Sequence, residues 1–217
     1  MSTAAMTMAK RVLIIYYSFT QQTRLLVKRF SQGLEQQGVE VVAERLLPVA
    51  PYELPFRSVL RLVAVMARTF FRHRDRIEPL SDRCYESYDR IVIAGPTWSY
   101  NPSGPVLDFM DRYAEKICGN RDVTVIISAR SYWRLNYFSM RKTLLKCGAK
   151  VTPPMVFEHP TKEPFRFVGL IMQLTGRMVR KESSWFRRHY PGYGHSREQF
   201  ALAFEQGVEM GRKITAK

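Results

Sequence analysis

The stretch from Arg11 to Phe30 restricts the fold of this chain more than any other segment. It opens with four consecutive strand-forming apolar residues, Val12 to Ile15, which is typical of a central strand buried on both faces of a parallel sheet. Ser18, Thr20 and Thr23 follow where the strand pattern gives way to an amphipathic helix. Hydroxyls and unpaired N–H groups at a helix start can converge on a phosphate, so a phosphorylated cofactor is the first hypothesis. The alternative is that Thr20 simply caps the helix and nothing binds there.

The rest of the chain repeats this alternation of strand and helix. Further strands are predicted at residues 39–43, 90–95, 123–127 and 151–157, and further helices at about 57–72, 106–116, 139–147 and 197–212. The pattern predicts an α/β fold with a five-stranded parallel sheet and helices on both faces. The 217 residues contain no linker or repeat, so we expect one domain over residues 1–217. An insertion is expected at about residues 158–196, between the fifth strand and the last helix.

The charge of the chain bears on its partners. A formal net charge of +15 and an isoelectric point of about 10.0 favour phosphate esters, acidic lipid headgroups or acidic proteins. Nucleic acid is not expected as a partner, because the positive residues are spread along the chain without a recognition motif.

The cysteines and the N-terminal segment bear on the compartment. Cys84, Cys118 and Cys147 are odd in number and far apart, which argues against a disulfide framework and a structural zinc site, and no metal site is predicted. Residues 1–10 have no apolar signal region, and no uncharged apolar stretch reaches the roughly 20 residues of a spanning helix. We therefore expect a cytoplasmic protein, soluble or peripheral at the inner membrane face.

Two further loops are expected to meet the first one at the same edge of the sheet. Residues 95–105, GPTWSYNPSGP, combine proline and glycine with two aromatic side chains. Residues 128–134, SARSYWR, again pair aromatic side chains with cationic donors. A flat apolar ligand would suit this combination.

Together these segments resemble flavodoxin-like FMN-binding proteins, a superfamily that includes FMN-dependent NAD(P)H:quinone reductases. YYSFTQQT is similar to the S-x-T-x-x-T phosphate loop of that family, and YDRIVIAGPTW resembles its third strand leading into the flavin loop. The resemblance implies a three-layer sandwich with strand order 2-1-3-4-5. Family loops often read T-G-N-T where this chain has Thr20-Gln21-Gln22-Thr23, and loss of the glycine narrows the backbone freedom for wrapping a phosphate.

The resemblance also implies which residues would hold the cofactor. Those from the first loop would contact the FMN phosphate, those from the second would lie beside the flavin ring, and those from the third would follow its pyrimidine side. The cofactor-binding residues implied are Ser18, Phe19, Thr20, Gln21, Gln22, Thr23, Pro96, Thr97, Trp98, Ser99, Tyr100, Ala129, Arg130 and Tyr132.

No side chain is identified as a nucleophile or metal ligand, which suits a protein whose reaction is carried by a bound cofactor. The leading hypothesis is an FMN-dependent oxidoreductase that passes hydride or electrons from a donor such as NAD(P)H to a quinone-like or other small organic acceptor. Three alternatives stay open: a flavodoxin-like electron carrier, a membrane-associated enzyme, and a module that has lost FMN and acts in binding. The membrane alternative draws on residues 165–182, which are similar to the tail of flavodoxin-like protoporphyrinogen oxidases. The oligomeric state is left open.

The helix expected at 57–72 bears on the membrane alternative. At about 100° per residue, Arg57, Arg61, Arg68 and Arg72 form one basic ridge. One interpretation is an ordinary helix that covers the sheet with its apolar side and leaves the ridge in solvent. The other is a surface that lies against acidic phospholipid, with residues 165–179 and a basic cluster as a second contact. That cluster comprises Arg177, Arg180, Lys181, Arg187 and Arg188.

Overall fold

The computed structural model describes residues 9–177, 185–190 and 192–216, apart from the side chain of Arg187. Within these residues one sheet follows the path β2-β1-β3-β5-β6, and every pairing along it is parallel. Its strands are β1 (Arg11–Tyr16), β2 (Glu40–Arg45), β3 (Arg90–Trp98), β4 (Asn101–Pro102), β5 (Asp122–Ala129), β6 (Lys150–Val151) and β7 (Met155–Glu158). The predicted order 2-1-3-4-5 is confirmed, because β4 only adds a short antiparallel hairpin to β3 and both β6 and β7 pair with β5.

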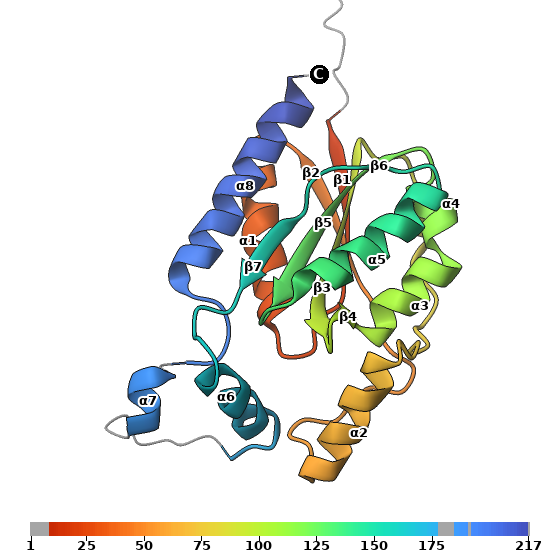
Figure 1. The fold of residues 1–217 in the computed structure, drawn as a ribbon. Helices are drawn as coiled ribbons and strands as arrows, with labels where there is room; N and C mark the ends of the chain where they lie inside the picture. The colour runs from red at the N-terminus through yellow and green to blue at the C-terminus, as the bar shows by residue number, and fades with distance from the viewer. Residues whose placement is uncertain (1–8, 178–184, 191, 217) are drawn as a thin grey trace, which may run out of the picture.

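Helices cover both faces of the sheet (Figure 1): α1 and α8 lie on one face, and α3, α4 and α5 on the other. The remaining helices, α2, α6 and α7, lie beyond one end of the sheet. The helices are α1 (Gln22–Glu35), α2 (Val59–Phe70), α3 (Gly104–Arg112), α4 (Ala114–Cys118), α5 (Trp133–Lys146), α6 (Phe165–Leu174), α7 (Trp185–His189) and α8 (Arg197–Thr215), with a 3₁₀ turn at Asp82–Tyr85.

The alternation of side chains along β1 divides the core into two layers. Leu13 and Ile15 join the cluster under α3, α4 and α5, whereas Val12 and Ile14 join the cluster under α1 and α8. All four side chains are completely buried, as expected for a strand with parallel neighbours on both sides. This central strand fixes the position of the loop that follows it.

The predicted fifth strand, residues 151–157, is interrupted. β6 ends at Val151 and β7 begins at Met155, and the gap contains Pro153 and Pro154. Proline has no backbone N–H to donate to the ladder, so the continuous strand expected from the apolar pattern cannot form there. The chain rejoins β5 at Ile126 and leads into the insertion after Glu158.

The helix expected to cover the sheet, α2, does not do so. Only Leu62 and Thr69 of α2 are buried, while Val59, Val63 and Phe70, which belong to the apolar side opposite the basic ridge, are exposed. α2 projects past the carboxyl ends of the strands, with α6 at the same end of the molecule (Figure 1). The interpretation of α2 as an ordinary sheet-covering helix is therefore wrong.

None of the helices in the described part of the chain combines the length and apolar character needed to cross a membrane.

Candidate functional site

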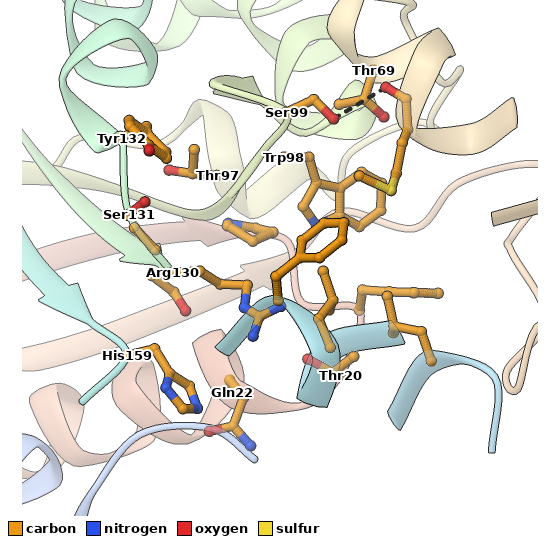
Figure 2. A pocket seen from close by; sticks show the side chains of 18 of the residues that line it. Thr20, Gln22, Thr69, Thr97, Trp98, Ser99, Arg130, Ser131, Tyr132 and His159 are labelled. Carbon is orange, nitrogen blue, oxygen red and sulfur yellow. Dashed lines mark hydrogen bonds between the residues drawn. The ribbon is translucent and has the colours of Figure 1, made fainter. Parts of the chain in front are cut away.

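A cavity of about 280 Å³ lies at the carboxyl ends of β1, β3 and β5 (Figure 2). The three loops expected to meet there form one side of it, while α2, α6 and residues 193–195 form the other. Twelve of the fourteen implied cofactor residues line the cavity: Phe19, Thr20, Gln22, Thr23, Pro96, Thr97, Trp98, Ser99, Tyr100, Ala129, Arg130 and Tyr132. Ser18 and Gln21 do not line the cavity; both contribute to the shape of the first loop instead.

Ser18 holds the first loop in shape. Its side chain is buried, and its Oγ accepts a hydrogen bond from the Arg24 amide at 3.1 Å. Thr20 makes no capping bond to α1, so the hypothesis that Thr20 caps the helix is wrong. The Thr20 hydroxyl instead faces the cavity beside Gln22 and Thr23.

Gln21 occupies the position where family loops often carry glycine. Its φ of 66° lies in the left-handed region, which costs a residue with a Cβ about 1 kcal/mol. The loop therefore keeps the conformation that glycine would favour, and it does so under strain. The Gln21 side chain points away from the cavity, with its Oε1 accepting from Arg24 Nη1 at 3.3 Å.

The start of α1 presents free donors to the cavity. The amides of Gln22 and Thr23 find no acceptor within the described ranges, as is usual for the first turn of a helix. Two threonine hydroxyls and these amides thus gather at one end of the cavity. This is a suitable arrangement for an anion.

The second loop is fixed by contacts with α2. Ser99 and Tyr100 both have positive φ, and Ser99 Oγ donates to the Met66 carbonyl oxygen at 3.1 Å. Asn101 Nδ2 donates to the carbonyl oxygen of Thr69 at 3.2 Å. These bonds connect the wall of the cavity to a helix that the sequence pattern did not assign to the site.

Aromatic rings occupy both sides of this loop. Trp98 packs edge-on against Phe19, with ring centroids 5.4 Å apart, and against Tyr17 at 5.7 Å. Tyr100 lies 4.9 Å from Tyr132 of the third loop, and both rings are exposed. Trp98 is thus fixed by packing against its neighbours, whereas Tyr100 and Tyr132 form a solvent-exposed pair at the edge of the cavity.

Arg130 extends from the third loop into the cavity. Figure 2 shows its side chain directed toward the side that carries Thr20 and Gln22. Its guanidinium donates to the carbonyl oxygen of Arg166 on α6, and the Arg166 guanidinium donates back to the carbonyl oxygen of Arg130. Burial lowers the pKa of Arg130, and its Nε has no hydrogen-bond partner in the described structure. Arg130 therefore brings a positive charge into the site, and one of its buried donors is unused.

The insertion contributes side chains that the sequence pattern did not indicate. Tyr193 donates its hydroxyl proton to Thr20 Oγ1 at 3.1 Å. The amide of His195 donates to Gln22 Oε1 at 2.9 Å, and the Gly194 amide lies 3.3 Å from His159 Nε2. Residues 193–195 therefore lie against the first loop, 173 positions away in sequence.

The two histidines of this region are held neutral. Burial lowers the pKa of both His159 and His195 to about 4, and the positive charge of Arg130 adds to the effect at His159. The amides of Thr161 and Gly194 lie 3.1 Å from Nδ1 and 3.3 Å from Nε2 of His159, so a neutral ring can accept a hydrogen bond from one of them and a protonated ring from neither. His195 is fixed by Ser128 Oγ, 2.7 Å from its Nε2, and by Gln199 Oε1, 3.2 Å from its Nδ1.

The other end of the cavity is apolar. Its side chains come from α2, α6 and the segment before α2, namely Phe56, Leu62, Val65, Met66, Phe167, Leu170 and Leu174. The signal available in the sequence was the apolar content of α2 and α6. The pattern could not show that these helices meet over the loops, because nothing local fixes their position.

The cavity therefore combines an anion-binding turn, aromatic walls, one arginine and an apolar end. Such a site can bind a flat molecule with a phosphate at one end. Buried Cys84 and Cys118 lie outside it, and burial raises the pKa of their thiols to about 11 and about 12, so neither is a nucleophile at neutral pH.

No protein-family model matches the chain, and no curated protein matches it in sequence. Solved structures do resemble it. A flavodoxin from the domain Archaea superposes with a TM-score of 0.54 at 11% identity, over 94% of this chain and 99% of the other. An FMN-complexed flavoprotein from Lactobacillus acidophilus gives 0.52 at 19% identity, over 68% and 93%.

An oxidoreductase from Corynebacterium diphtheriae gives a TM-score of 0.53 at 12% identity, over 96% of this chain and 98% of that one. The archaeal and corynebacterial likenesses span nearly the whole of each structure, and the strand order of the sheet agrees with the order implied by the sequence. The chain therefore has the flavodoxin-like fold.

Proposed function

We propose that the protein binds FMN and acts as an FMN-dependent oxidoreductase. The observation that carries the proposal is the cavity at the carboxyl ends of β1, β3 and β5, with phosphate donors at one end and apolar and aromatic walls at the other. One structural neighbour is a flavoprotein in complex with FMN, and another is a flavodoxin. These likenesses support a flavin as the ligand of this cavity.

The side chains present are chemically suited to FMN. Thr20, Thr23 and the free amides of the first turn of α1 would hold the phosphate. Arg130 offers a buried Nε that lacks an acceptor in the described part of the chain. Tyr100 and Tyr132 provide exposed rings against which a flat ring system could stack.

Bound FMN would supply hydride or electron transfer, and the protein would position and tune it. The positive charge of Arg130 would favour negative charge on a ligand in the cavity. α2 and α6 would exclude water through the apolar side chains that they place along its wall.

The same apolar wall favours a quinone-like or other apolar organic acceptor over a strongly polar one. The donor is proposed to be a soluble reductant such as NAD(P)H. A pure electron carrier is a weaker proposal, because family carriers are typically acidic and this chain has a net charge of +15.

One observation favours a different function, that of a module without FMN that acts in binding. Tyr193 bonds to Thr20 and the amide of His195 bonds to Gln22, so the insertion already occupies polar groups of the first loop. In the FMN proposal these contacts cover a bound phosphate. In the alternative they replace it.

Titration with FMN and with riboflavin separates the two. We expect a yellow complex in which FMN binds at least tenfold more tightly than riboflavin, because the phosphate adds charge-assisted hydrogen bonds. Thr23→Ala should reduce this preference, while Thr215→Ala, at an exposed position of α8 outside the cavity lining, serves as the matched control. A colourless protein that does not bind added flavin would leave only the binding module.

Enzyme and carrier are then separated by anaerobic titration of the loaded protein with NADH, NADPH and menadione. Reduction by a nicotinamide followed by reoxidation by menadione is expected for the oxidoreductase. If neither nicotinamide reduces the flavin, while flavin reduced chemically with dithionite is reoxidised by menadione, the carrier would be favoured instead.

A further inference from the structure

α2 exposes several large apolar side chains to solvent. Leu60 is 82% exposed, Val63 51% and Val59 40%, and the C-terminal end of the helix adds exposed Phe70 and Phe71. An amphipathic helix of a soluble protein normally turns such residues toward the core. Several of them together on one helix therefore indicate a surface that is covered by something else.

α6 contributes to the same end of the molecule. Phe167 and Val168 are exposed on it at 51% and 42%. Its C-terminal end is connected to the segment before α2, because the amide of Phe56 donates to the Leu174 carbonyl oxygen at 2.7 Å. The two helices thus form one projecting end, beyond the carboxyl ends of the strands (Figure 1).

Positive charge surrounds this apolar end. Between Glu53 and Asp75 the only acidic residues are these two. The neighbouring arginines are Arg57, Arg61, Arg68, Arg72, Arg74 and Arg76, of which Arg68 pairs with Asp75 and Arg74 with Asp111. The Arg57 side chain is 81% exposed, and its Nη2 lies 3.7 Å from Glu53 Oε2 in a weak surface ion pair. Arg61 has no ion pair within the described residues. Lys162 and Arg177, before and after α6, are also exposed.

We propose that the end formed by α2 and α6, with Leu60, Val63 and Phe167 at its surface, docks on an anionic phospholipid bilayer. The aliphatic and aromatic side chains would enter the interface, and the arginines would contact lipid phosphates. A second copy of this chain is a poorer occupant, because it would bring an equally positive surface into contact. Arg180 and Lys181, part of the basic cluster noted in the sequence, lie outside the described residues, as does the side chain of Arg187, and the proposal does not use them.

Docking in this orientation would place the cavity next to the lipid. Its apolar end is lined by Leu62, Met66 and Phe167, from the same two helices. An apolar acceptor dissolved in the bilayer could then enter between α2 and α6. This last step rests on the proposed oxidoreductase function, whereas docking does not.

Sedimentation with vesicles tests the proposal. The full chain should pellet with vesicles that contain phosphatidylglycerol and stay in solution with phosphatidylcholine vesicles, both at low salt. The double variant Leu60→Glu, Arg61→Glu should bind at least tenfold more weakly. The matched control is Leu202→Glu, Arg141→Glu, which changes one exposed leucine and one exposed arginine on α8 and α5. Equal loss in both variants would reduce the binding to general attraction by a basic protein and overturn the proposal.

A second measurement examines insertion itself. An environment-sensitive dye on Leu60→Cys should shift to the blue with anionic vesicles, while the same dye on Leu202→Cys should not. Binding without a shift at Leu60 would overturn the proposal, since adsorption by charge alone leaves the dye in water. Both measurements are made with and without added FMN, so failure of flavin binding would leave the test of docking intact.

Discussion

Two pairs of helices, α1 with α8 and α2 with α6, differ in where they place their apolar side chains. α1 and α8 lie side by side on the sheet and bury Leu26, Phe30 and Met210 in a shared core. α2 buries only Leu62 and Thr69 and leaves its most exposed leucine, Leu60, in solvent. The first pair stabilises the fold, while the second pair lines the cavity and presents an apolar surface.

Similar amphipathic patterns can therefore have different uses. Both α1 and α2 have a clear apolar stripe in sequence, yet only α1 faces the sheet. The packed pair, α1 and α8, should therefore tolerate few substitutions at its contact. Substitutions at the exposed positions of α2 and α6 should leave stability unchanged and should change binding instead.

The strongest loss of stability is expected at the closest approach of α1 and α8. A Cβ on Gly207 would lie 2.2 Å from the Phe30 carbonyl oxygen, and one on Gly33 would lie 2.2 Å from the Phe204 carbonyl oxygen. Both neighbours are backbone atoms that cannot move aside. Gly207→Leu should therefore lower the free energy of unfolding by about 3 kcal/mol or more, measured by urea denaturation.

Two controls make this test specific. Ala201→Leu adds the same side chain at an exposed position of α8 and should change stability by no more than about 0.5 kcal/mol. Leu60→Ala on α2 should also be close to neutral. A loss of more than about 1 kcal/mol in Leu60→Ala would mean that α2 stabilises the fold after all and that the two helix pairs do not differ in this respect.

The next effect concerns acid sensitivity at the open end, where His159 and His195 are buried. Their pKa is about 4 in the folded protein against 6.5 when exposed, so the unfolded chain takes up protons that the folded chain does not. Stability should be insensitive to these groups above pH 6.5 and should fall as the pH drops from 6.5 toward 4. The contribution of each histidine is about 2 kcal/mol over this window.

His159→Gln should make the loss of stability on acidification about 2 kcal/mol smaller, as measured by denaturation at a series of pH values. His73→Gln is the control, because His73 is about half exposed and lies outside the cavity lining. An identical pH profile in wild type and His159→Gln would show that the insertion does not hold a neutral histidine.

Features that depend on neighbouring residues in the sequence could be predicted, and contacts between residues far apart in the sequence could not. Val12 to Ile15 and Thr20 carry a local strand–turn–helix pattern, so the sheet and the first loop could be predicted. Trp98 and Arg130 follow predicted strands and converge because of the strand order. Tyr193 reaches Thr20 only through the path of the insertion, and no periodicity in the sequence records that contact. Pro153 and Pro154 did carry a local signal, the missing amides, which the apolar pattern obscured.

A smaller effect is expected at Arg130, which connects the third loop to α6 through its hydrogen bonds with Arg166. Arg130→Gln removes the positive charge in the cavity and should weaken FMN binding about tenfold, or about 1.4 kcal/mol. Loss of a cation near the flavin should also lower the reduction potential of the bound cofactor. Flavin fluorescence titration and redox titration measure the two quantities.

Arg134→Gln is the matched control for this change. Arg134 is the last residue of the same loop, but it is exposed, and its guanidinium carbon lies 5.0 Å from the ring centroid of Trp133. It should leave both the FMN affinity and the potential unchanged. If Arg130→Gln behaves like the control, Arg130 connects the loop to α6 and takes no part in binding.

The weakest effect is expected at Gln21, the residue just before α1. Its φ of 66° strains a residue with a Cβ, so Gln21→Gly should relieve the strain and raise the free energy of unfolding by about 0.5 kcal/mol, after the entropic cost of glycine in the unfolded chain. Gln22→Gly is the contrasting change, because it removes the acceptor of the His195 amide and puts glycine inside α1. It should destabilise the protein by about 1 kcal/mol or more. Loss of stability in Gln21→Gly would mean that its side chain, through the bond to Arg24, contributes more than the backbone strain costs.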